Sequence, residues 1–142
     1  MMQITKDQLK GWNVCEDGYK WFLRRFPSGE AEYQDVLNAL AEDDRPNDAD
    51  WLMDRAGPDI QAVIEVEVIA NCKHFFAAGQ LIIKAGAIIS GQLRAGGGIE
   101  AGGGIKAGGG IGAGGGIGAG GGLRAGGGNE AGGASGAGGG PA

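Results

Sequence analysis

The sequence is poor in the residues that catalysis, disulfides and zinc sites require. Its 142 residues include one histidine and two cysteines, and Cys15 and Cys72 stand in different segments. Two cysteines without a repeated spacing predict neither a disulfide framework nor a zinc site. His74 lies beside Phe75 and Phe76, a setting in which a structural histidine is more common than a catalytic one. We therefore expect no enzyme, no metal site and no cofactor.

Long apolar runs are missing as well. No segment reaches the ~18 apolar residues that a transmembrane helix needs, so we expect no contact with a membrane. The first residues are polar from Gln3 onward, unlike those of a signal peptide. These features predict a protein of the cytoplasm, in a bacterial host.

Negative charge is concentrated in the front half. Residues 1–73 hold fifteen of the 17 acidic residues but only eight of the 12 basic ones. We expect no direct binding of nucleic acid, because that requires basic patches that neutralise phosphate.

One acidic cluster is a candidate for binding a protein partner. Its members are Glu42, Asp43, Asp44, Asp48 and Asp50. The spacing does not fit a calcium loop, because the glycine needed at the sixth position is missing. A solvated loop between two helices, with capping roles for the acids, is the alternative.

Residues 3–58 predict a small helical domain. Thr5 and Gln8 form a capping-box pattern, and a helical face follows at i, i+3, i+4 and i+7. That face consists of Tyr19, Phe22, Leu23 and Phe26. Ser28 is the expected cap of a third helix, and Pro46 separates that helix from a fourth. Because about 55 residues bury only a marginal core, we expect this domain to need support from the rest of the chain.

The hydrophobic period changes at residue 61. Ile64, Val66 and Val68 alternate with other residues in the two-residue period of a strand. Residues 93–128 then contain six copies of one six-residue unit: an aliphatic residue, a variable residue, alanine and three glycines. The aliphatic phase extends upstream as far as Phe75, so the repeat continues a conventional strand sequence.

A short fixed period predicts a β-solenoid. In each unit the aliphatic residue and the alanine point to one side of a strand, and the variable residue points to the other. The glycines are expected to form corners, where positive φ angles favour them. Three sides of six residues give a coil of 18 and predict three stacks inside. These stacks are Leu93 over Ile111, Ile99 over Ile117, and Ile105 over Leu123.

The expected fold class is therefore α+β. A helical head at 3–58 precedes a strand entry and narrow solenoid at 61–128, followed by a frayed or disordered tail at 129–142. Two alternatives compete for the repeat. A flexible glycine-rich linker is one, and a bundle of polyproline II helices, whose three-residue period divides six, is the other.

Two resemblances support this organisation. The repeat "LRAGGGIEAGGGIKAGGG" resembles the hexapeptide β-solenoids, including the bactofilin type, which use far fewer glycines. The front segment, "ITKDQLKGWNVCEDGYKWFLRRFP" with "AEYQDVLNALAEDDRPNDADWLMDRAGP", resembles a small helical module of bacterial and prophage proteins that carry short repeats behind it. The second resemblance implies a mobile-element setting, in which small acidic proteins often inhibit host defence.

The functional hypothesis is a non-catalytic, phage- or prophage-encoded protein that binds another protein. It would inhibit a host defence system of the anti-CRISPR or anti-restriction type, by occlusion or by imitating the charge of DNA. The expected partner surface is a basic, nucleic-acid-binding face of a defence complex. The alternative is a structural solenoid that assembles into dimers or filaments through its ends, where strand edges are open.

Overall fold

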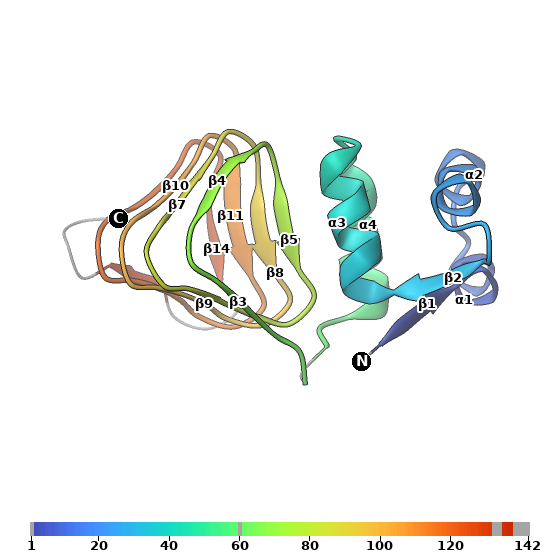
Figure 1. The fold of residues 1–142 in the computed structure, drawn as a ribbon, viewed down its shortest axis with the longest axis horizontal. Helices are drawn as coiled ribbons and strands as arrows, with labels where there is room; N and C mark the ends of the chain where they lie inside the picture. Colours follow the sequence, from blue (N-terminus) through green and yellow to red (C-terminus); the bar gives the residue numbers. More distant parts are fainter. Residues whose placement is uncertain (1, 60, 132–134, 138–142) are drawn as a thin grey trace.

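The computed structural model describes residues 2–59, 61–131 and 135–137. A head of four helices is followed by a parallel β-solenoid, so the predicted α+β arrangement is confirmed (Figure 1). Within these residues, no helix has the length and apolar character needed to cross a membrane.

The head combines the helices with one small sheet. Its elements are β1 (Gln3–Thr5), α1 (Lys6–Gly11), α2 (Glu16–Arg25), β2 (Glu30–Glu32), α3 (Tyr33–Glu42) and α4 (Pro46–Ala56). The capping box is confirmed, because Gln8 N donates to Thr5 Oγ1 at 3.2 Å and Thr5 N donates to Gln8 Oε1 at 2.9 Å. The apolar face of α2 turns inward and buries Trp21 and Phe22.

The predicted cap at Ser28 is wrong, because a short strand intervenes before the third helix. Ser28 Oγ donates to the carbonyl of Glu30 at 3.1 Å instead of capping a helix. Gly29 turns the chain at a φ of 81°, and β2 then pairs antiparallel with β1. A three-residue strand that is not part of a repeat is too short to show a two-residue period, so the sequence did not reveal this pair.

The solenoid runs from β3 to β15 as three parallel sheets. The β3 sheet contains β3 (Val63–Val66), β6 (Gln80–Ile83), β9 (Ile99–Ala101), β12 (Ile117–Ala119) and β15 (Ser135–Ala137). The β4 sheet contains β4 (Ile69–Cys72), β7 (Ala87–Ile89), β10 (Ile105–Ala107) and β13 (Leu123–Ala125). The β5 sheet contains β5 (Phe75–Ala77), β8 (Leu93–Ala95), β11 (Gly110–Ala113) and β14 (Gly128–Ala131).

The register of the strands confirms the predicted stacks. Leu93 pairs with Ile111, Ile99 with Ile117, and Ile105 with Leu123. All six side chains are buried in one continuous core. Parallel β pairing excludes both the flexible linker and the polyproline II bundle for these residues.

The solenoid also continues beyond residue 128, into the segment expected to be frayed or disordered. Asn129 pairs with Ile111 in β14, and Ser135 pairs with Ile117 in β15. The strand register is thus kept where the aliphatic residue has been replaced. Residues 132–134 and 138–142 lie outside the described part of the chain.

The corner glycines are required for a different reason from the one predicted. Within the described residues, positive φ angles occur at Gly29 and Gly57 but at no glycine of the solenoid corners. A Cβ atom at Gly96 would lie 2.4 Å from the carbonyl oxygen of Ala78, and one at Gly114 would lie 2.2 Å from that of Gly96. The first glycine of a corner is therefore required by close stacking on the preceding coil.

The head rests on the outer face of the β5 sheet, which provides the expected support. Helices α3 and α4 lie beside this sheet in Figure 1, and Phe76 and Ala78 belong to the core of the head. Gln34 of α3 also closes the open edge of β5. Its Nε2 donates to Phe76 O at 2.7 Å, and its Oε1 accepts from Ala78 N at 2.7 Å.

Candidate functional site

The acidic cluster surrounds the turn between α3 and α4. Helix α3 ends at Glu42 with Asp43 as its C-cap, and Asp44 adopts a φ of 54°, a conformation that aspartate tolerates better than most residues. Pro46 then opens α4 at the first helical position, where its missing N–H costs nothing. The turn places consecutive carboxylates in opposite directions, toward α2 and toward the solenoid.

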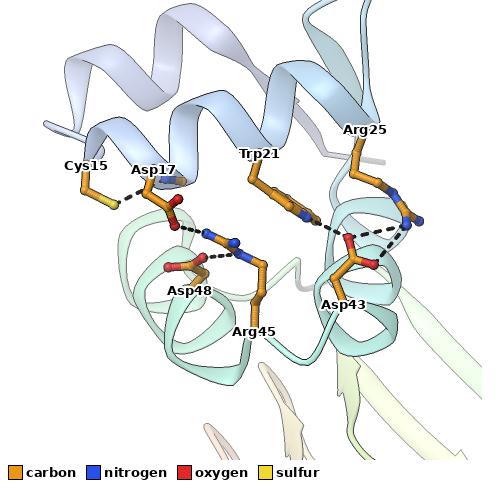
Figure 2. A network of polar contacts seen from close by, with 8 residues as sticks. Cys15, Asp17, Trp21, Arg25, Asp43, Arg45 and Asp48 are labelled. Atoms are coloured by element: carbon orange, nitrogen blue, oxygen red, sulfur yellow. Dashed lines mark hydrogen bonds and ion pairs between the residues drawn. The ribbon is translucent and has the colours of Figure 1, made fainter.

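Two of the acids are used inside the head (Figure 2). Asp43 accepts hydrogen bonds from Trp21 Nε1 at 2.7 Å and from Arg25 Nη1 at 3.2 Å, which ties α3 to α2. Arg45 donates from Nε to Asp48 at 2.6 Å, and its Nη2 reaches Asp17 of α2. Its guanidinium also lies over the Trp21 ring, 5.6 Å from the centroid.

A third acid, Asp44, joins the head to the solenoid. It accepts from Lys73 Nζ at 2.6 Å and lies 2.7 Å from His74 Nε2. The hydrogen bond from Lys73 lowers the pKa of Asp44 most, and the bond from His74 lowers it further. Because His74 Nδ1 accepts the N–H of Gln92 at 3.0 Å, the ring proton is assigned to Nε2, which donates to Asp44. Both nitrogens of this buried ring are thus committed to structure.

The fourth acid, Asp50, binds the wall of the β5 sheet. Arg94 projects outward from β8 and donates to Asp50 at 2.7 Å and to Asp54 at 2.9 Å. Burial lowers the pKa of Arg94, but the two carboxylates outweigh it and raise the pKa overall. The contact lies one coil above Phe76, so the same wall holds the head by apolar and by ionic contacts.

The structure therefore places the cluster at a junction. Asp43, Asp44, Asp48 and Asp50 are each balanced by a cation of this chain. Glu42 forms a weaker ion pair, because its Oε1 lies 3.8 Å from Arg25 Nη2 and 68% of its side chain is exposed. Internal pairing weakens the field that these acids project toward a basic partner. Their role in partner binding stays a prediction.

The head contains an apolar pocket that the sequence did not predict. It has a volume of about 220 Å³ and lies between the α1–α2 pair and the α3–α4 pair. Its apolar lining includes Leu9, Val14, Trp21, Phe22, Trp51 and Leu52. The available signal was the placement of all three tryptophans of the chain in the head, because two of them, Trp21 and Trp51, line the pocket.

The mouth of this pocket carries one exposed thiol. Cys15 caps α2, and its Sγ accepts the N–H of Gly18 at 3.4 Å. Val14 and Trp51 are half-buried beside it. The pocket is thus reachable from solvent, with an apolar interior and a chemically addressable rim.

A second hollow lies where the head overhangs the solenoid. This cleft, of about 710 Å³, is bounded by Asp50 and Met53 of α4 and by the outer faces of β8 and β11. Gly112 occupies the outward position of β11 next to Arg94, so no side chain fills the space there. Across the described ranges, no three histidine, cysteine or acidic side chains are placed to hold a metal ion.

Comparison with known proteins gives similarities to the head. Residues 2–56 match the family model described as the YdhT N-terminal domain. Over 55 residues the chain is 38% identical to the uncharacterized protein YdhT of Escherichia coli strain K12. That match covers 39% of this chain and 20% of the relative, so the chain spans about a fifth of the curated protein's length. No solved structure matches.

Proposed function

We propose that this protein is a non-catalytic binding protein whose head captures another protein by an exposed apolar side chain. The observation that carries the proposal is the tryptophan-lined pocket of about 220 Å³ in the head. Apolar pockets that receive a large side chain dominate the energy of many protein interfaces. The solenoid serves as a stiff support for this head.

Several contacts favour a rigid presentation of the pocket. The core of the head includes Phe76 of β5, and Arg94 holds α4 through Asp50 and Asp54. Because the wall fixes α3 and α4, the pocket that they bound with α1 and α2 is preorganised. Preorganisation favours binding, because less conformational entropy is lost when the partner arrives.

The surroundings of His74 and Cys72 also support a binding role. Both ring nitrogens of His74 are engaged, and 5% of its side chain is exposed. Burial raises the pKa of the Cys72 thiol, which disfavours the reactive thiolate at neutral pH.

Blocking the pocket mouth tests the proposal. In a Cys72→Ser background, N-ethylmaleimide modifies Cys15 alone and places a bulky group at the rim. Immobilised protein is then exposed to host lysate, and the bound proteins are quantified by mass spectrometry. We expect the modified protein to retain at least tenfold less of its specific partner than the unmodified protein does.

The matched control is the Cys15→Ser variant in the same Cys72→Ser background, treated with the same reagent. Serine still caps α2 but does not react, so the partner should remain bound. A partner that binds the modified protein and the control equally would refute the proposal. Circular dichroism of each sample checks that the head remains folded.

The narrower hypotheses stay predictions. These are the prophage setting, the inhibition of an anti-CRISPR or anti-restriction target, the cytoplasmic location and membership of the hexapeptide, bactofilin-like solenoids. The captured protein itself would decide the target: a defence nuclease or its complex would support the inhibitor hypothesis, and any other partner would remove it.

A further inference from the structure

Two walls of the solenoid remain outside the junction with the head. On the β3 sheet, the register places Glu65, Ile82, Glu100 and Gly118 in one outward row, here called the β3 face. On the β4 sheet, Ile88, Lys106 and Arg124 form the corresponding row, here called the β4 face. These rows differ in charge.

The exposed large apolar side chains lie on these two walls or at the corner between them. Among the described residues, the exposed large apolar side chains are Val63, Val68 and Ile88, with exposures of 52%, 56% and 68%. Val63 begins β3, Val68 precedes β4, and Ile88 is at the centre of β7. A shallow apolar hollow of about 430 Å³ runs along the β4 face beside Ile88, Lys106 and Arg124. Such apolar surface is typical of interaction sites.

The charges on the two faces are opposite. The β3 face carries Glu65 and Glu100, whereas the β4 face carries Lys106 and Arg124, and all four are exposed. Within the described part of the chain, none of the four makes an ion pair, in contrast to the acids at the junction. Each face therefore presents charge that is available to a partner of opposite sign.

The order of residues along the two rows is complementary. Within each coil the two faces are six residues apart, so Ile82 corresponds to Ile88, and Glu100 corresponds to Lys106. One coil further, Gly118 corresponds to Arg124 and leaves room for its long side chain. The two rows are offset by about a third of the strand spacing, roughly 1.6 Å, which flexible side chains absorb.

We propose that the β3 face of one chain binds the β4 face of a second copy, with the two solenoids side by side and parallel. Ile82 then meets Ile88, and Glu100 meets Lys106 of the neighbouring copy. Contact between two identical faces is disfavoured, because it brings Glu100 near Glu100 or Lys106 near Lys106. The complementary charges thus select both the partner and its orientation.

This contact is heterologous, so a pair of chains keeps one free β3 face and one free β4 face. Repeated use of such a contact generates a ring or an open array and does not stop at a dimer. The β5 sheet takes no part, which leaves the head and its pocket outside the contact. Because only short strands meet, the interface is at the small end of the range for specific contacts, and association should depend on concentration.

A charge-swap experiment tests the proposal. Sedimentation of the wild-type chain at increasing concentration should show species larger than a dimer. Lys106→Glu and Glu100→Lys should each raise the concentration needed for half association at least tenfold, because each variant makes like charges meet. Arg24→Glu and Glu30→Lys change the net charge equally at exposed head positions and should leave association unchanged.

Mixing the two variants gives the decisive result. In the mixture, each face of one variant finds a face of opposite charge on the other, so association should return to within about threefold of wild type. A double variant carrying both changes should behave in the same way. A wild-type chain that stays monomeric at the highest concentration overturns the proposal. Variants that associate normally, or a mixture that fails to recover, overturn it as well.

Discussion

The head and the solenoid specify their structures in different ways. The head uses contacts that each occur once, such as the Thr5 capping box, the Trp21–Asp43 bond and a core of aromatic rings. The solenoid uses one unit many times, so the same aliphatic stack and the same glycine corner recur in each coil. The comparison shows that each kind of contact recurs in the solenoid interior and occurs once in the head.

The two regions share one large buried side chain, Phe76. Phe76 stands at an outward position of the solenoid, where its counterparts in the later coils are Arg94 and Gly112. It is nevertheless 0% exposed and belongs to the core of the head. Phe76 thus points outward from the solenoid and into the core of the head.

The largest effect is expected from Phe76→Ala, which removes the shared side chain. We expect a loss of about 3–5 kcal/mol in the free energy of unfolding, the usual cost of deleting a buried phenylalanine. Urea denaturation measures it. Ile88→Ala removes an exposed aliphatic side chain from the same solenoid and, in dilute solution, should cost about 0.5 kcal/mol or less. Equal losses in the two variants would contradict the junction.

A smaller effect is expected from a methyl group at a corner. Gly114→Ala places a Cβ atom 2.2 Å from the carbonyl oxygen of Gly96 and should cost about 1–3 kcal/mol through overpacking. Gly118→Ala meets no atom within 4 Å and should leave stability within about 0.5 kcal/mol. Thermal unfolding of the pair compares them. If neither substitution lowered the thermal stability, the corner glycines would reflect a compositional bias and would not be required for stacking.

The smallest effect concerns pH at the turn that joins the two regions. Lys73 and His74 hold the pKa of Asp44 below its usual 3.8, so the folded state binds the proton less tightly than the unfolded state. The resulting stability is present above pH 3.8 and is lost as the pH falls through the lowered pKa. Asp44→Asn removes this contribution. The gap in urea midpoint between wild type and Asp44→Asn should therefore narrow below pH 3.8.

That gap is measured at a series of pH values from neutral to acidic. If the difference in urea midpoint stays constant down to the most acidic pH at which both proteins fold, the charge of Asp44 does not stabilise the folded protein.

Much of the fold could be predicted because it depends on spacing. The six-residue phase of the aliphatic residues, read with the alternation of side chains in a strand, gave the stacks from Leu93 to Leu123. The capping box at Thr5 and the helical face around Phe22 are equally local signals. Each of these features depends on neighbours in sequence or on a period, and both are visible without a structure.

The rest depends on contacts that no period records. Ser28 looked like a helix cap, but pairing between β1 and β2 took priority. No local pattern paired Asp44 with Lys73 or Asp50 with Arg94, because these two cations come from the solenoid. The corner glycines were assigned correctly for a mistaken reason, because the clash with the preceding coil appears only when coils are stacked. The available clue to the junction was the spacing of Phe76 and Arg94, because residues 18 apart occupy the same outward position in successive coils.

Unfolding followed by two probes tests most directly that the head and the solenoid form one cooperative unit. Tryptophan fluorescence reports the head alone, because all three tryptophans lie there, and hydrogen exchange at the aliphatic positions of β7 to β12 reports the solenoid. The junction predicts that both signals change at the same urea concentration, and that Phe76→Ala shifts both together. Two separate transitions, with Phe76→Ala moving the fluorescence alone, would contradict this account.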